Sequence, residues 1–455
     1  MNRLTVSYGI RFDYHANSFP EQTLGPTRFT PNRNITFPEQ DNLSYKDITP
    51  KSQVVYDLFG NGKTAVKVSL NKYLTGLGTT NGVTPVTLGP NPINLLNTSV
   101  TRSWVDGNRN YIPDCDLLNR NAQNNLAAGG DSCGAFDDAT FGLPTPNTQF
   151  DPDLLEGWGK RYYNWEFSTG IQQEILPRVS MDVGYFRRWY GNFVVQDNRA
   201  VSASEYETFS IVAPSDPRLP DGGGYTVSGY RTISQGAFGR AADNFTTLAD
   251  NYGKQTSHWN GVDVNVNARL SNGIFVQGGT STGRTSTDNC EILSALPEIS
   301  PSGAPYCHQD TNWLTQVKGA ASYTIPRIDV ATSATYQYLP GPEIAANWAA
   351  PNSAIAPSLG HVLAGGAATQ TVNLVTPGTT YNDGLTQLDL RFAKIFRIGT
   401  TRATINFDLY NATNSNTILT LNNGFVPLAG GGATWQVPTA ILQPRFWKIG
   451  AQFDF

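Results

Sequence analysis

The chain has 455 residues, of which 15% are charged and 11% aromatic, whereas roughly 25% are charged in ordinary soluble proteins. Its 32 basic and 36 acidic residues leave a net charge of −4, so no basic field is available to bind the backbone of a nucleic acid. No stretch approaches the roughly 20 consecutive apolar residues of a transmembrane helix, which excludes a helical membrane protein.

The first residues alternate between apolar and polar side chains, which is the pattern of a β-strand with one apolar face. The apolar face carries Leu4, Val6, Tyr8, Ile10, Phe12 and Tyr14. This start lacks the charged region and the continuous apolar region of a signal peptide. We therefore expect that sequence upstream of Met1 is missing.

The same alternation recurs along the chain, within residues 66–70, 179–185, 262–270, 388–392 and 405–409. Transmembrane β-strands alternate in this way because only every second side chain faces lipid. The residues expected to face lipid include Val6, Ile10, Val264, Phe407 and Phe453.

Tight turns and long loops alternate between the predicted strands. The tight turns are expected at 60–63, 174–178, 271–273, 325–328 and 397–401. The long loops are expected near 15–48, 74–159, 197–255, 286–312, 340–383 and 414–441. Outer-membrane barrels have short periplasmic turns and long extracellular loops, so the sequence predicts an all-β, antiparallel outer-membrane β-barrel with about 12 strands present. The first strand would rise to the outside and the last would end in the periplasm.

The second long loop contains oxygen-bearing side chains at alternating positions. They are Asp106, Asn108, Asn110, Asp114 and Asp116. Oxygen ligands at this spacing are typical of Ca²⁺ loops, although the bidentate Glu of an EF-hand is absent. Two interpretations stay open, a structural Ca²⁺ site and a polar turn that holds no metal. No other cofactor is expected.

The four cysteines form two local pairs, Cys115 with Cys133 and Cys290 with Cys307, and each pair closes a short polar segment. This spacing predicts two loop disulfides in an oxidising compartment. Four free thiols are the alternative, because no CxxC or Cys/His cluster indicates a metal site.

Seven tryptophans lie near predicted strand ends or in loops: Trp104, Trp158, Trp165, Trp189, Trp259, Trp313 and Trp348. At strand ends they favour an aromatic girdle at the membrane surface. Stacking on a ligand such as a sugar or a peptide is the functional alternative. The histidines, at 15, 258, 308 and 361, are scattered and no GxSxG or HExxH motif accompanies them, so no enzyme activity is expected.

The final strand ends the chain on an aromatic residue. Its apolar positions include Trp447, Ile449, Phe453 and Phe455. A terminal Phe in such a strand resembles the signal read by the barrel-assembly machinery, so that machinery is an expected partner.

Several longer blocks resemble the TonB-dependent receptors, and among them the Oar-like barrels common in acidobacteria. The blocks are YGIRFDY, WEFSTGIQQEILPRVSMDVGYFRRWYGNF, DNRAVSASEYETF, DLYNATNSNTIL and ILQPRFWKIGAQFDF. The resemblance implies a 22-stranded barrel with an N-terminal plug, energised by the TonB complex. Residues 1–455 would then be the C-terminal part of that barrel, without the plug.

The leading hypothesis is therefore a barrel segment of a TonB-dependent receptor or transporter in the outer membrane of a Gram-negative bacterium. Its partners would be outer-membrane lipid, an unknown ligand bound by the outer loops, and the TonB complex acting through the missing plug. One alternative is a secreted β-rich binding or adhesion protein. The other is an outer-membrane barrel enzyme, which would require a convergent Ser/His or Asp/His pair.

Overall fold

The computed structural model describes residues 3–77, 89–145, 148–270, 273–399, 401–432 and 434–454. Most of its strands belong to one large sheet, called here the main sheet, in which each strand is antiparallel to the next strand along the path. Its path comprises β1 (Leu4–Phe19), β4 (Gln40–Asp57), β5 (Thr64–Leu74), β11 (Tyr163–Leu176), β12 (Val179–Gly191), β17 (Thr256–Arg269), β18 (Phe275–Asp288), β20 (Leu314–Ile325), β21 (Val330–Leu339), β24 (Leu385–Ile398), β25 (Thr401–Tyr410) and β29 (Phe446–Asp454). The predicted all-β, antiparallel fold is confirmed.

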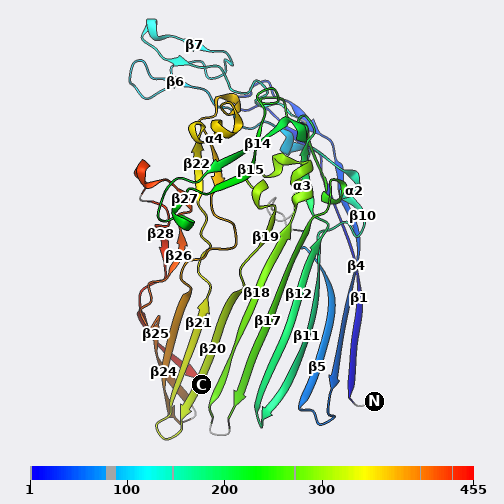
Figure 1. The fold of residues 1–455 in the computed structure, drawn as a ribbon, viewed down its shortest axis with the longest axis vertical. Coiled ribbons are helices and arrows are strands. Elements are labelled where there is room, and N and C mark those ends of the chain that lie inside the picture. The colour runs from blue at the N-terminus through cyan, green and yellow to red at the C-terminus, as the bar shows by residue number, and fades with distance from the viewer. Residues whose placement is uncertain are drawn as a thin grey trace.

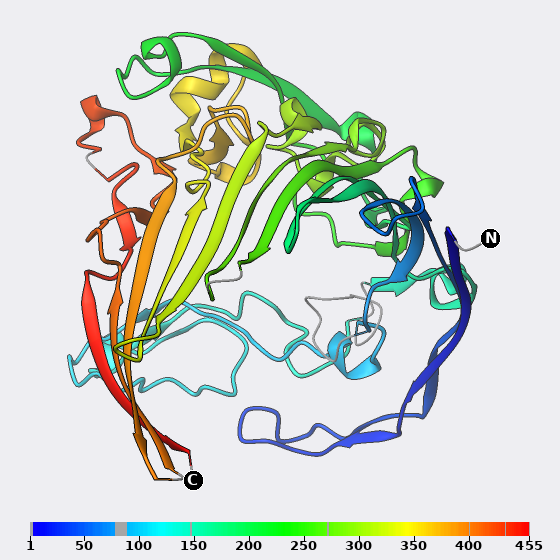
Figure 2. The ribbon, with the colours of Figure 1, turned by 90° about the horizontal axis from the view of Figure 1, so that it is seen from below.

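The main sheet is a curved arc whose strands run along the long axis of the molecule (Figure 1). Seen from below, β1 and β29 lie at the two ends of the arc (Figure 2). Within the described residues, β1 pairs only with β4, and β29 pairs only with β25. Each end of the arc therefore presents one unpaired strand edge.

The tight turns lie at one end of the sheet and the long connections at the other, as the sequence predicted. In the turn between β4 and β5, Gly60 and Gly62 both have a φ of 72°, and the carboxylate of Asp57 accepts their N–H groups at 2.9 and 2.8 Å. Positive φ values are the reason that such turns favour glycine. Of the turn expected at 271–273, residues 271 and 272 lie outside the described residues.

The first long connection is shorter than expected. The sequence placed a loop near 15–48, but β1 continues to Phe19 and β4 begins at Gln40. These strands extend past the rest of the sheet because Leu43 and Tyr45 are buried against Leu154. Burial of these apolar side chains stabilises paired strands in a segment that the sequence analysis assigned to a loop.

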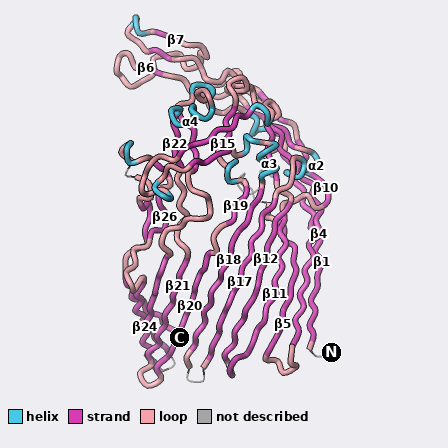
Figure 3. Tube along the Cα trace, in the orientation of Figure 1, coloured by secondary structure: helices cyan, strands magenta, loops and turns pink. Residues whose placement is uncertain are grey.

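The long connections contain the short elements of the fold, and the helices drawn in Figure 3 lie at this end. Among the residues that the structure describes, the α-helices are α2 (Pro152–Leu155), α3 (Cys290–Ala295) and α4 (Asn352–Leu359). The longer of the short strands are β13 (Val194–Asn198), β14 (Tyr206–Val212), β15 (Thr226–Ile233), β16 (Asn244–Leu248), β22 (Asn347–Pro351), β23 (Thr369–Asn373), β26 (Ile418–Leu421) and β28 (Pro438–Ile441). The remaining short strands are β2 (Gln22–Leu24), β3 (Ile35–Phe37), β6 (Trp104–Val105), β7 (Gln123–Asn124), β8 (Ser132–Cys133), β9 (Thr148–Phe150), β10 (Glu156–Trp158), β19 (His308–Asp310) and β27 (Gly424–Phe425). In the described part of the chain, no helix has both the length and the apolar character that crossing a membrane requires.

The strand registers place most of the apolar side chains of the main sheet on one face, although β18 contributes Gly278, Thr280 and Thr282 to it. Directly paired residues share a face, and the pairs on this face include Val6–Val54, Val54–Val68, Val183–Val264, Phe392–Phe407 and Phe407–Ile449. Many of these side chains are exposed, among them Ile10 at 76% and Phe453 at 59%. The opposite face carries mostly polar residues and glycine.

Three long connections fold together into a compact unit, the loop cap, defined as residues 206–233, 344–375, 424–432 and 434–435. Its buried core consists of Phe209, Ile211, Ala213, Leu219, Tyr230, Ala346, Ala350, Ile355, Leu363, Val372, Leu374, Val375, Phe425 and Trp435. The cap is therefore packed around its own apolar core, beyond the end of the main sheet.

Candidate functional site

A cavity of about 620 Å³ lies on the polar face of β17, β18, β20, β21 and β24. We call this part of the face the polar wall. Its polar lining residues are Asp263, Asn265, Asn267, Gln277, Thr280, Ser281, Gln316, Lys318, Thr335, Gln337, Gln387 and Asp389. A cavity that spans five neighbouring strands forms on the inner side of a curved sheet, so the polar face is the concave one.

The register aligns the long polar side chains in rows across the strands. One row runs from Asn265 through Gly279, Lys318 and Gln337 to Gln387, each residue being directly paired with the next. Paired residues project from the same face of a sheet, so strand alternation alone brings these groups from five strands to one surface.

Hydrogen bonds hold one side of this surface in place. Gln337 Nε2 donates to Gln387 Oε1 at 2.9 Å, and Gln387 Nε2 donates to Asp389 Oδ1 at 2.9 Å. Asp389 Oδ1 also accepts the backbone N–H of Asn411 at 2.8 Å. These amides are therefore oriented before any ligand arrives.

The other side of the polar wall has an unsatisfied acceptor. Asp263 Oδ1 is buried and has no hydrogen-bond partner among the described residues. A buried carboxylate oxygen without a partner is costly, and Asp263 is also one of the residues that line the cavity. The cavity lining has two carboxylates, Asp263 and Asp389, and one ammonium group, Lys318, which makes its charge close to neutral.

The structure brings together four of the five residues of the predicted calcium loop. The carboxylate of Asp106 accepts the backbone N–H groups of Asn110 and Tyr111 at 3.2 and 2.9 Å, and the side-chain amides of Asn108 and Asn110 donate to Asp114 Oδ2. Asp116 lies apart from this group.

Asp116 pairs instead with the segment that follows it. Its N–H donates to Gln123 Oε1 at 3.0 Å, and its Oδ1 accepts the N–H of Leu118 at 2.9 Å. The described residues contain no group of three or more His, Cys, Asp or Glu side chains placed to hold a metal ion. A Ca²⁺ ion bound by these residues stays a prediction.

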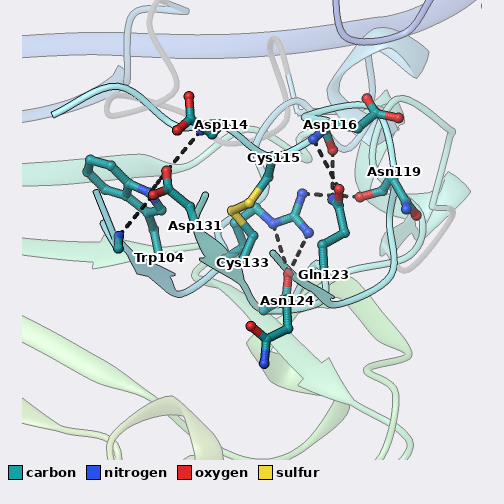
Figure 4. The surroundings of a disulfide bond; sticks show 12 residues. Trp104, Asp114, Cys115, Asp116, Asn119, Gln123, Asn124, Asp131 and Cys133 are labelled. Carbon is teal, nitrogen blue, oxygen red and sulfur yellow. Dashed lines mark hydrogen bonds between the residues drawn. A yellow bond between two sulfur atoms is a disulfide. The ribbon is translucent and has the colours of Figure 1, made fainter. Parts of the chain in front are cut away.

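A buried aspartate organises the segment around this loop, which we call the disulfide finger (residues 101–137). Asp131 accepts hydrogen bonds from the Trp104 indole and from the N–H groups of Gly107 and Asp114, all at 2.9 Å (Figure 4). The bond from Asp114, and then that from Trp104, hold the pKa of Asp131 below its ordinary value. No sequence pattern distinguished Asp131 from the other loop aspartates, so sequence reasoning missed it.

Both cysteine pairs form disulfides in the structure. Cys115 is bonded to Cys133 inside the disulfide finger (Figure 4), and Cys290 is bonded to Cys307, which ties the start of α3 to the residue preceding β19. The finger extends beyond the rest of the molecule (Figure 1), so its shape depends on local bonds.

Residues of the final strand that were assigned to the assembly signal lie on the apolar face. Trp447, Ile449 and Phe453 are 63%, 62% and 59% exposed on β29. Phe455 lies outside the described residues. Recognition of this strand by the barrel-assembly machinery stays a prediction.

Two histidines pair with carboxylates in the outer connections. His308 Nδ1 lies 3.1 Å from Asp288 Oδ2, and His361 Nε2 lies 3.1 Å from Glu207 Oε1. The Val362 carbonyl and then Glu207 raise the pKa of His361. Over the described ranges, neither ring has a hydroxyl or thiol within hydrogen-bond distance, so neither pair has the arrangement of an activated nucleophile.

No family model and no curated protein matches this chain. Among solved structures, the ferric-catecholate import receptor Fiu from E. coli K12 shares 12% identity with a TM-score of 0.45, over 100% of this chain and 43% of that one. The outer membrane transporter YddB from Escherichia coli shares 12% identity with a TM-score of 0.47, over 99% of this chain and 51% of that one.

The ferripyoverdine receptor of the outer membrane of Pseudomonas aeruginosa shares 9% identity with a TM-score of 0.43, over 99% of this chain and 36% of that one. This chain thus spans about half, or less, of the length of the solved structures that it matches. All three of those proteins are described as receptors or transporters. Likeness at this level assigns neither a ligand nor a partner.

Proposed function

We propose that this chain forms part of the wall of an outer-membrane receptor that takes up a scarce ligand. The observation that carries the proposal is the pair of unlike faces on the main sheet. One face is mainly apolar on most strands between β1 and β29 and is widely exposed, and the other holds the polar wall. A membrane barrel requires lipid outside and polar residues inside.

A soluble sandwich would distribute these residues differently. Its apolar rows would be covered by a second sheet about 10 Å away. The three buried apolar clusters of the structure instead lie in the long connections and the loop ends of the strands. Lipid is therefore the cover that the proposal assigns to Val6, Ile10, Val264, Phe407 and Phe453.

The strand edges support a larger receptor wall. An unpaired N–H or C=O group costs several kcal/mol in hydrocarbon, and both β1 and β29 have one unpaired edge. In the proposed receptor these edges pair with further strands, and energy for uptake comes from the TonB complex through a plug domain. Its extracellular side is the end with the loop cap and the disulfide finger.

Two neighbouring residues of β17 provide the test. Val264 lies on the apolar face and Asn265 on the polar wall. In the complete protein produced in a Gram-negative host, Val264→Arg is expected to cost about 2–4 kcal/mol in lipid and to lower the yield of heat-modifiable protein in the outer membrane. Asn265→Arg is the matched control, and it should assemble normally.

The result that contradicts the proposal is equally direct. Equal yields for the two variants would show that the two faces meet the same environment. Recovery of the unmodified protein as a freely soluble monomer would support the secreted binding protein instead.

A further inference from the structure

The indole of Trp259 lies flat on the concave face of the main sheet, immediately above the cavity of the polar wall. A Cβ added to Gly261 would lie 2.1 Å from Trp259 Cη2, and one added to Gly283 would lie 2.4 Å from Trp259 Cζ2. Gly261 and Gly283 are directly paired across β17 and β18. The six-membered ring of Trp259 therefore lies where side chains at positions 261 and 283 would otherwise stand, so its position requires glycine at both.

A second ring lies beside it on the same face. Phe186, which is paired with Gly261, packs over Gly184, where an added Cβ would lie 2.8 Å from Phe186 Cε2. Gly184 is in turn paired with Asp263. The side chains of Trp259 and Phe186 thus both pack over glycine residues, at the border of the polar wall that is nearer to the long connections.

Hydrogen-bonding groups begin directly below the rings. Asp263 is two residues from Gly261 on the same face, a distance of roughly 7 Å along the strand. Its unpartnered Oδ1 is accompanied in the same row by Ser281 and Gln316. The next row holds Asn265, Lys318 and Gln337.

We propose that this surface binds a neutral oligosaccharide, with one sugar ring on Trp259 and its hydroxyl groups on the polar wall. The face of an aromatic ring is electronegative and attracts the C–H groups that line one side of a sugar ring. Each sugar hydroxyl both donates and accepts, as the amides of Asn265, Gln316 and Gln337 do.

The charge of the cavity disfavours other ligand classes. Its two carboxylates and one ammonium group would not attract an anionic metal chelate, whose charge needs several cationic partners. The surface also lies on paired strands, so it has no free backbone groups with which an extended peptide could form a ladder. A neutral polyhydroxyl ligand fits both constraints.

The inference rests on the proposed function in one respect, that the concave face is the watery side of a receptor. It is tested with the complete protein purified in detergent, by calorimetric titration with cellohexaose, maltohexaose, laminarihexaose, xylohexaose, mannohexaose and chitohexaose. At least one of these should bind with a Kd below about 1 mM. Trp259→Ala should weaken that binding at least about tenfold.

Two further variants separate ligand stacking from a structural role of the indole. Gly283→Ala keeps Trp259 but displaces its ring, and it should weaken binding in the same direction as Trp259→Ala. Trp313→Ala is the matched control and should leave binding unchanged. Trp313 precedes Leu314, the partner of Gly283, and therefore lies on the opposite face. All variants should retain heat-modifiable migration.

Four outcomes overturn the inference. They are a lack of binding by all six hexasaccharides, binding that Trp259→Ala leaves unchanged, Trp259-dependent binding of a ferric catecholate only, and Trp259-dependent binding of a peptide only. Absence of saccharide binding in protein recovered from the outer membrane would overturn this inference alone. Recovery of the protein outside the membrane would overturn the proposed function as well.

Discussion

In the loop cap, Ile211 and Ile355 are 0% exposed, whereas on the apolar face of the main sheet Ile10 and Phe453 are 76% and 59% exposed. The same residue types thus have two environments within one chain. The cap removes apolar surface from water by packing, as a soluble protein does. The main sheet has hydrogen-bonded strands and leaves much of its apolar face exposed.

The two regions should therefore respond to different perturbations. A cavity in the core of the loop cap should destabilise the cap and leave the main sheet intact. Each strand of the main sheet is held by backbone hydrogen bonds to its neighbours. Changes of pH or metal should act at the loop end on Asp216 and on the predicted Ca²⁺ loop, which lie outside the strands of the main sheet.

The largest effect is expected from a cavity in the cap. Phe209 is 1% exposed and its ring centroid lies 5.6 Å from that of Tyr230. Phe209→Ala should destabilise the cap by about 3–5 kcal/mol. Hydrogen exchange should rise throughout the cap and stay slow in β17 and β18.

Val212→Ala is the control for this change, because Val212 lies on the cap strand β14 but is 61% exposed. It should leave exchange in the cap nearly unchanged. If the strands of the main sheet also lose protection in Phe209→Ala, the two regions form one cooperative unit and the comparison fails.

A smaller effect is expected from an ion pair that joins two connections of the cap. Asp216 is buried and lies 2.7 Å from Arg218, whose guanidinium also donates to the carbonyl of Gly432 at 2.8 Å. Asp216→Asn should cost about 2–3 kcal/mol, the range for a hydrogen bond to a charged group. Exchange should rise near Leu428, whose N–H donates to Asp216.

Acid should reproduce this loss in the unmodified protein. The hydrogen bond from Arg218 holds the pKa of Asp216 well below its ordinary value. A carboxyl whose pKa is lowered by folding stabilises the fold above its unfolded pKa of about 3.9, and this stabilisation is lost as the pH falls through the folded pKa. Exchange in the cap should therefore rise below about pH 4, and Asp216→Asn should show less of this dependence.

The smallest effect is expected in the disulfide finger. If Ca²⁺ binds the loop with the weak affinity of extracellular modules, Kd about 1 mM, then 10 mM Ca²⁺ should stabilise the finger by about 1.4 kcal/mol. Limited proteolysis should slow accordingly. Asp106→Asn and Asp114→Asn should abolish the effect of Ca²⁺, and Asp153→Asn, outside the finger, should preserve it.

Equal proteolysis with and without Ca²⁺ would favour the polar turn without metal. Reduction of the Cys115–Cys133 bond is a useful positive control. It should open the finger to protease and leave the loop cap and the main sheet unaffected, because the bond closes a segment of only 18 residues within the finger.

The strands could be predicted because their signal is local. Alternation within β17 places Val262, Val264 and Val266 on one face, and the neighbouring strands repeat it. Each short turn then fixes the register of the two strands that it joins. The expected loop at 15–48 was too long because the burial of Tyr45 depends on Leu154, more than a hundred residues away along the chain.

The polar wall and the loop cap could not be predicted either, because their contacts also join residues that are far apart in the sequence. The position of Trp259 over Gly283 arises only once β17 and β18 are in register, and a glycine by itself carries no such signal. The cap core joins Phe209, Ile355 and Phe425, which belong to three separate connections without any periodicity. Asp131 became distinctive only through the three N–H groups that surround it.

The residues that form the cap core also restrict the order in which parts of the molecule can fold. Phe425 and Trp435 come from the last long connection, yet they complete a core that begins with Phe209, more than two hundred residues earlier. The cap core is therefore incomplete until Phe425 and Trp435, which lie in the connection between β25 and β29, are in place. Among the described elements, the loop cap should thus be one of the last units to reach its folded form.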